Sequence, residues 1–201
     1  MDKRAIISII CAAVLVVATG AYFTLRSEPE LNGITAMDGY ELVKSLIEES
    51  YGNSTIVLFT ANALNNANIS NGMSEGWQYI FEVEQQVNYK VFVINVFSNM
   101  AYEIIHTGSS TLPLDQWGAY SPINNWSLDS DEAYEIALSN EEVNNYMVNN
   151  PKGEFIRLES VHTHPVWKIG WIYYFSVNSP KYAEVHISAE TGEIVYLDVD
   201  Y

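Results

Sequence analysis

The feature that most constrains this chain is an eight-residue phrase that occurs twice. "GWQYIFEV" begins at Gly76 and "GWIYYFSV" begins at Gly170, so six of eight letters agree at an offset of 94 residues. The same offset aligns Tyr-Glu-Leu at 40–42 with Tyr-Glu-Ile at 134–136. A constant offset across several elements indicates an internal duplication.

Each copy is predicted to form one helical stretch followed by four strands. Apolar residues at helical spacing mark 37–50 and 129–148, and Asp129 with Glu132 forms a capping-box pattern. The expected strands cover 55–61, 77–87, 89–97 and 101–106 in the first copy, and 154–162, 167–177, 183–188 and 194–199 in the second. Short turns between the later strands predict antiparallel pairing.

Alternation within the repeated phrase separates two faces of a strand. Trp, Tyr, Phe and Val recur at every second position, so they share one face, which we expect to be buried under the helix. The opposite face is the candidate contact surface. It carries Gln78, Ile80 and Glu82 in the first copy and Ile172, Tyr174 and Ser176 in the second.

These patterns predict an α+β fold of two tandem modules, each a helix on an antiparallel sheet, behind an N-terminal transmembrane helix. The expected divisions are an anchor or signal segment at 1–26, modules at 27–107 and 128–201, and a joint at 108–127. The joint contains three aromatic residues, Trp117, Tyr120 and Trp126, so we expect it to pack against one or both copies.

The N-terminal segment is predicted to be a membrane anchor. Residues 5–25 carry no charge and follow Lys3 and Arg4, which predicts a single-pass helix with the body outside the cytoplasm. A cleaved signal peptide and a filament-forming helix are the alternatives. The Asn-x-Ser/Thr acceptors at Asn53, Asn68 and Asn125 are candidate N-glycosylation sites in such a location.

Composition and charge exclude several function classes. With 25 acidic and 9 basic residues, the chain has a net charge of −16, which argues against nucleic acid as a partner. Cys11 is the only cysteine, so the body can form no disulfide. No nucleophile elbow, phosphate loop or His-Glu-x-x-His motif is present, and we expect neither catalysis nor a cofactor.

His162 and His164 form the best metal candidate. On one strand, residues i and i+2 share a face, so both imidazoles could bind one ion. A metal site needs a third ligand, and the sequence indicates none nearby, while Pro165 indicates that the pair lies at a strand end. We therefore favour a solvent-exposed or locally bonded pair, with a metal site as the alternative.

The second copy resembles a PepSY domain. The resemblance rests on "DEAYEIAL" at 131–138, "VWKIGWIYYFSV" at 166–177 and the Thr-Gly-Glu turn within "KYAEVHISAETGEIVYLDVD" at 181–200. It covers about 127–198, whereas the first copy lacks that turn. The resemblance implies a helix on a curved antiparallel sheet, similar to cystatin-like folds, and a non-catalytic module that binds or restrains peptidases.

The expected function is therefore that of a membrane-anchored, extracytoplasmic binding module. Its partner would be a protein, namely a peptidase or another envelope protein. The alternative is a structural surface or filament subunit that self-assembles through its apolar N-terminal helix.

Overall fold

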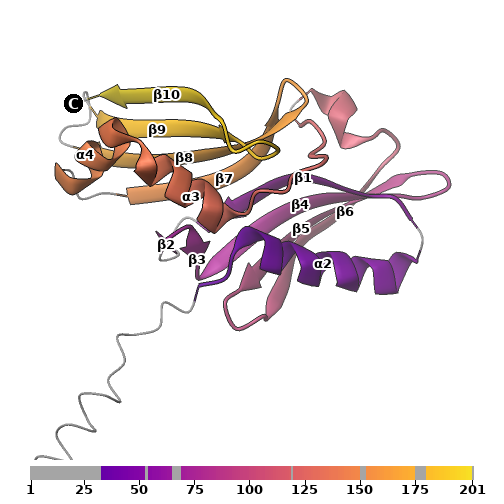
Figure 1. Ribbon diagram of the computed structural model, residues 1–201. Coiled ribbons are helices and arrows are strands. Elements are labelled where there is room, and N and C mark those ends of the chain that lie inside the picture. The colour runs from indigo at the N-terminus through magenta and orange to yellow at the C-terminus, as the bar shows by residue number, and fades with distance from the viewer. Residues whose placement is uncertain are drawn as a thin grey trace, which may run out of the picture. The chain divides into compact units, whose positions relative to one another are not determined.

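The computed structural model describes residues 33–52, 54–64, 69–118, 120–149, 153–174 and 180–200 (Figure 1). Residues from Gly33 onward form one compact unit. Within it, the first copy contributes β1 (Ile56–Ala63), β4 (Gly76–Glu84), β5 (Tyr89–Phe97) and β6 (Tyr102–Ser110), together with a short hairpin of β2 (Ile69–Ser70) and β3 (Met73–Ser74). The second copy contributes β7 (Gly153–Val161), β8 (His164–Tyr174), β9 (Pro180–Ser188) and β10 (Ile194–Asp200).

The prediction of two tandem modules is wrong, because both copies share one sheet. Eight strands run in the order β10-β9-β8-β7-β1-β4-β5-β6, and each neighbouring pair is antiparallel. The copies join through their first strands, with Ala61 opposite Leu158. The order is the same from either edge, so an approximate two-fold axis passes between β1 and β7. Hydrogen-bonding the two first strands removes one free edge from each copy.

The three α-helices of the described residues pack on one face of this sheet (Figure 1). Helix α2 (Ala36–Tyr51) lies over β1, β4 and β5. The second copy's helical stretch is broken at Asn140, whose backbone is extended, into α3 (Ser130–Ser139) and α4 (Glu141–Asn149). Because of this break, α4 reaches β9 and β10 and covers the edge of the second copy.

The helices α2 and α3 begin at the approximate axis and contact each other there. The Ala36 amide donates to Ser130 Oγ at 3.0 Å. The Met37 amide donates to Asp129 Oδ1 at 3.0 Å, and the same oxygen accepts from the Ser130 amide at 2.6 Å. One carboxylate therefore caps both helices, which satisfies amides that helix starts leave without partners.

Aromatic side chains form a continuous core across the axis. Trp77 and Trp167, both fully buried, meet edge-on with ring centroids 6.2 Å apart. Trp126 lies 5.6 Å from Tyr40 and 5.9 Å from Trp167. The two copies therefore bury their large side chains against each other rather than in separate cores.

The repeated phrase is not structurally equivalent in the two copies. The indole of Trp77 donates to the Ile34 carbonyl, 43 residues earlier, and that of Trp167 donates to the Leu128 carbonyl, 39 residues earlier. Trp77 thus corresponds to Trp167 and not to Trp171. The strand has shifted by four residues relative to its helix, and an even shift keeps the same residues inward. Trp171 is accordingly buried, as the alternation predicts.

The joint between the copies packs against both of them, as its aromatic residues predict, and it lies on both faces of the sheet. Its 3₁₀ helix η1 (Leu114–Trp117) follows β6, and the Leu114 amide donates to Glu82 Oε2 at 2.7 Å. Ile123 then bridges to β1, its amide donating to the Leu58 carbonyl at 2.8 Å. From there the chain reaches Trp126 on the helical face.

The prediction of a single-pass membrane protein is not supported by the structure. Within the described ranges, no helix is long and apolar enough to span a membrane. A span needs about 20 predominantly apolar residues, whereas α2 has 16 residues and includes Asp38, Glu41 and Lys44. Residues 5–25, on which the prediction rested, lie outside the described residues.

Candidate binding surface

The sheet face opposite the helices carries a row of polar side chains that crosses all eight strands. Each residue is paired in register with the next. From β6 to β10 the row is Glu103, Asn95, Gln78, Asn62, Arg157, Lys168, His186 and Tyr196. The amide Nε2 of Gln78 donates to Asn95 Oδ1 at 3.1 Å. We call this face the outer face.

Two hollows of about 310 Å³ each lie side by side on the outer face. The apolar hollow is over the first copy and is lined by Ile80, Val91, Val93, His106, Gly108, Ser109, Ser110, Leu114, Trp117 and Tyr120. The polar hollow is over the β1–β7 junction and is lined by Phe59, Thr60, Asn62, Ile80, Tyr120, Ser121, Arg157, Glu159 and Ser160. Ile80 and Tyr120 belong to both and separate them.

The predicted contact residues are divided by this arrangement. Gln78 and Ile80 lie on the outer face, in the polar row and between the hollows respectively. Glu82 is 4% exposed because η1 covers it, so it holds the joint instead of facing a partner. Ile172 is half-buried on β8, and the side chains of Tyr174 and Ser176 are outside the described part.

The environment of Glu82 makes this region acidic. Burial raises the pKa of its carboxyl, the Leu114 amide opposes that change, and the charges of Asp115 and Glu84 raise the pKa further. Three carboxylates therefore gather beneath and beside η1, next to the apolar hollow. A positively charged group would be favoured there.

Strand β6 is an edge strand with exposed apolar side chains. Tyr102 and Ile104 are about half exposed, at 49% and 52%, because α2 does not extend over this strand. Ile105 forms a bulge and is 49% exposed. The other edge differs, since Leu197 and Val199 of β10 pack against the core. The two edges differ because the helix break at Asn140 lets α4 contact β9 and β10. The apolar spacing of the sequence did not predict this break.

A second polar cluster lies at the β9–β10 end of the outer face, and sequence reasoning missed it. Tyr182 and Tyr196 donate to Asp198 Oδ2 at 2.6 and 3.1 Å, which raises the pKa of Tyr182 to about 12. His186 Nε2 lies 2.5 Å from Glu184 Oε1. Polar residues at every second position of β9 were the available signal. The side chains of this cluster therefore form their hydrogen bonds with one another.

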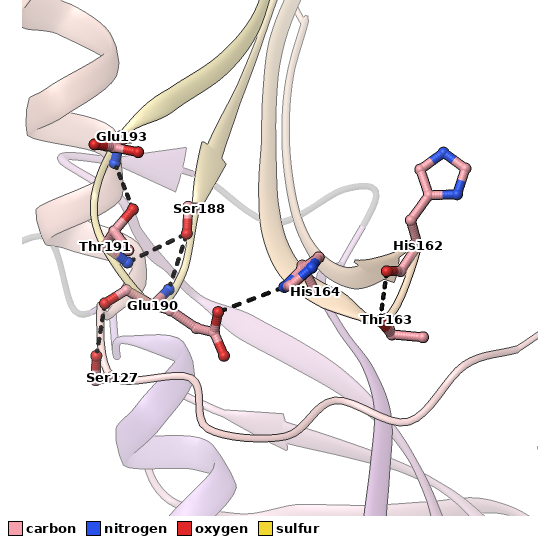
Figure 2. Close-up of polar contacts among 8 residues, drawn as sticks. All are labelled: Ser127, His162, Thr163, His164, Ser188, Glu190, Thr191 and Glu193. Carbon is pink, nitrogen blue, oxygen red and sulfur yellow. Dashed lines mark hydrogen bonds and ion pairs between the residues drawn. The ribbon is translucent and has the colours of Figure 1, made fainter.

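His162 and His164 do not share a face. The positive φ angles of His162 and Thr163, 50° and 73°, form a two-residue turn that reverses the chain between β7 and β8. Figure 2 shows the His162 ring directed away from His164, whose Nδ1 lies 3.6 Å from Glu190 Oε2. The strand does not continue through 162–164, so the i, i+2 rule does not apply to this pair.

The Thr-Gly-Glu turn of the second copy lies beside His164 (Figure 2). Ser188 Oγ accepts from the amides of Glu190 and Thr191 at 3.4 and 3.2 Å, and Gly192 has a φ of 75°. Ser127 Oγ contacts the Glu190 carbonyl at 3.5 Å. These bonds hold the turn against the joint. They give the Thr-Gly-Glu sequence of the turn a structural role.

The described residues add no further ligands to the candidate metal site, and they include one of the three candidate glycosylation sites. In the described ranges, no group of three or more His, Cys, Asp or Glu side chains could hold a metal ion. Asn125 is exposed, with a φ of 56°. Asn53 and Asn68 lie outside the described residues.

Two comparisons with known sequences bear on the identity of the chain, and neither finds a match. No family model matches the chain, and no curated protein matches it. The resemblance to PepSY domains therefore remains an expectation from the sequence.

Proposed function

We propose that this protein is a non-catalytic binding protein that adds an extended segment of a partner protein to the free edge of β6. The observation that carries the proposal is the uncovered state of this strand on both faces. Tyr102 and Ile104 are exposed on the helical face, and the apolar hollow adjoins β6 on the outer face. Alternate side chains of an added strand would contact both sets.

Strand β6 carries neither lysine nor proline, the two residues that most often protect an edge strand. Glu103 is the only acidic or basic residue of "YEIIHTGSS" apart from His106. The bulge at Ile105 is the one interruption of its pairing with β5.

Charge defines the partner segment further. Glu103 lies on this edge and Asp115 lies on η1, which follows β6, in a chain with a net charge of −16. The partner segment is therefore extended, with apolar side chains alternating along it and lysine or arginine at its ends. The PepSY resemblance makes a peptidase the first class of partner to test.

The test uses synthetic peptides of defined composition and fluorescence anisotropy. An alternating Val/Thr peptide with lysine ends should bind. The same peptide with glutamate ends, or with alternate backbone nitrogens methylated, should bind at least tenfold more weakly. Ile104→Lys should abolish binding by placing a charge on the edge. Val195→Lys is the matched control on the β10 edge, where Val195 is 56% exposed, and it should bind normally.

Two results would contradict the proposal. One is equal binding of lysine-ended and methylated peptides, which excludes strand pairing. The other is a protein that dimerises in ultracentrifugation and becomes monomeric with Ile104→Lys, which assigns the β6 edge to a second copy.

A further inference from the structure

The polar hollow at the β1–β7 junction is a separate feature from the β6 edge. It lies across the approximate two-fold axis, and both copies line it. Thr60 of β1 pairs with Glu159 of β7, and Asn62 pairs with Arg157. Its volume of about 310 Å³ is within the range of small-molecule sites, roughly 300–1,000 Å³.

The charged residues around the hollow include one more positive charge than negative charge, so one cation can bind an anionic ligand. Glu159 lies 2.5 Å from Lys168 Nζ and 3.7 Å from Arg157 Nη1, so two cations face one carboxylate. The Arg157 side chain is 54% exposed. Among the described residues, its guanidinium has this ion pair and no hydrogen bond. A local positive charge of this kind is unusual on a chain with a net charge of −16.

Two buried polar atoms at the hollow also lack protein partners. Asn62 Oδ1 and Ser160 Oγ are buried and accept or donate no hydrogen bond within the described part of the chain. The other end of the Asn62 amide is fixed, because Nδ2 donates to Thr60 Oγ1 at 2.8 Å. Buried polar atoms are generally hydrogen-bonded, so each exception asks for a ligand or another explanation. Asn62 Oδ1 requires a donor.

Phe59, Ile80 and Tyr120 form an apolar part of a lining that is otherwise mostly polar. The rings of Phe59 and Tyr120 meet edge-on at 6.2 Å, and Ile80 lies beside them. This part suits an aliphatic or aromatic side chain of a ligand. The hollow thus offers an arginine for an anion, an amide oxygen for an N–H donor, and an apolar surface.

We propose that this hollow binds the carboxylate of an apolar α-amino acid residue. Arg157 binds the carboxylate, which its planar fork matches in two parallel hydrogen bonds. Asn62 Oδ1 accepts from the ligand's amide or ammonium nitrogen, and the side chain packs on Phe59, Ile80 and Tyr120. A free amino acid and the C-terminal residue of a peptide share this chemistry. The site does not depend on the proposed function of the β6 edge.

Titration calorimetry with three probes tests the proposal. Phenylalanine and N-acetyl-phenylalanine carry the carboxylate, whereas phenylalanine amide does not. We expect the amide to bind at least tenfold more weakly than the better of the two acids. Tighter binding of phenylalanine identifies the free amino acid as the ligand, and tighter binding of the acetylated form identifies a peptide C-terminus. Absence of binding by both acids, or equal binding of the amide, overturns the proposal.

Variants separate recognition from folding. Arg157→Gln should weaken the better acid at least tenfold, and Arg157→Lys should recover part of the loss. Lys44→Gln removes one positive charge on α2, across the sheet, and should leave binding unchanged. Asn62→Leu should weaken binding while raising the thermal midpoint, because it removes a buried atom without a partner. An Arg157→Gln protein that is folded and binds as the wild type does contradicts the assignment.

Discussion

At the scale of single residues, the two copies form the same kind of two-residue turn with different amino acids. The first copy reverses at Asn71-Gly72, with φ angles of 49° and 76°, and the second reverses at His162-Thr163, with 50° and 73°. Asn-Gly is the preferred pair for two-residue turns of this kind. Thr163 is β-branched, and a positive φ is costly for such a residue.

Replacing His162-Thr163 by Asn-Gly should therefore stabilise the protein. The left-handed conformation costs roughly 1–2 kcal/mol for a residue with a Cβ, so we expect the free energy of unfolding to rise by about 1–2 kcal/mol. Urea unfolding of the double variant His162→Asn, Thr163→Gly measures this. His164→Asn, in the adjoining strand, is the control and should change little. A fall in stability would show that the native side chains contribute contacts of their own.

The converse change belongs to the first copy. A Cβ at Gly72 would lie 2.4 Å from both the Asp131 Cα and the Ser130 carbonyl oxygen, and φ is already positive. Gly72→Ala should lower the free energy of unfolding by about 2 kcal/mol or more, since backbone at the start of α3 must move. Thermal unfolding checks this, with Gly118→Ala as control: its φ is also positive, but no atom lies within 4 Å of its Cβ position.

The prediction that His162 and His164 share a strand face depended on backbone angles that the sequence does not reveal. His-Thr is not a turn signal, so alternation was continued through 162–164. Pro165 correctly indicated a strand boundary, but not the reversal that places the two rings on different sides.

At the scale of elements, Asp129 is the residue on which two helices depend. Its Oδ1 accepts from the amides of Ser130 and Met37, at the starts of α3 and α2. Burial is the largest influence on its carboxyl and raises the pKa above 3.8. Hydrogen bonds from Thr35, Ser130 and Met37 oppose this rise, and the charge of Asp131 adds to it.

Two substitutions at Asp129 should differ in how much stability they cost and in how that cost depends on pH. Asp129→Ala removes the acceptor of the Met37 and Ser130 amides, whereas Thr35 Oγ1 still accepts from the Asp38 amide, and should cost about 1–3 kcal/mol. Asp129→Asn keeps an acceptor oxygen and should cost much less. A raised pKa in the folded state means that the stability from this carboxyl is present below pH 3.8 and is lost as the pH rises through the raised value. Asp129→Asn should therefore gain stability relative to wild type over that interval. Denaturant unfolding at several pH values measures the difference, and an opposite slope would contradict the raised pKa.

The elements themselves were largely predictable from the sequence, but their alignment was not. Alternation located the eight strands within a few residues, and the helical spacing located α2 and α3. The shift of four residues could not be seen in the sequence, because the repeated phrase aligns Trp77 with Trp171. The hydrogen bonds of the two indoles show that Trp77 corresponds to Trp167. Helix–strand contacts, which fix the true equivalence, are not visible in letters alone.

At the scale of the whole molecule, the duplicated halves form one sheet with one core. Each half contributes its helices and then four long strands to the sheet, with the β2–β3 hairpin added in the first half, and no pattern in the sequence indicates that the halves join. What joins them is the pairing of β1 with β7, and alternation within a strand does not specify its partner. The polar row and the polar hollow depend on the same pairing, which is why neither was predicted from the sequence.

A shared core predicts that the two halves unfold together. Trp167 of the second copy contacts Trp77 of the first and Trp126 of the joint, so each half buries the aromatic side chains of the other. We expect one cooperative transition, with the same midpoint for amide signals from β5 and from β9 in urea. Trp167→Ala should lower both midpoints equally, and by about 3–5 kcal/mol in free energy, as for other large core truncations.

The surface variant Trp117→Ala provides the matched control for that substitution. Trp117 is 59% exposed on η1, so its removal should leave both midpoints nearly unchanged. If Trp167→Ala shifted only the β9 signals, the halves would be independent domains despite their common sheet. A fragment of residues 33–126 gives a second measurement. It exposes the paired edge of β1 and the Trp77 ring, and should lack the dispersed amide spectrum of the first half in the intact chain.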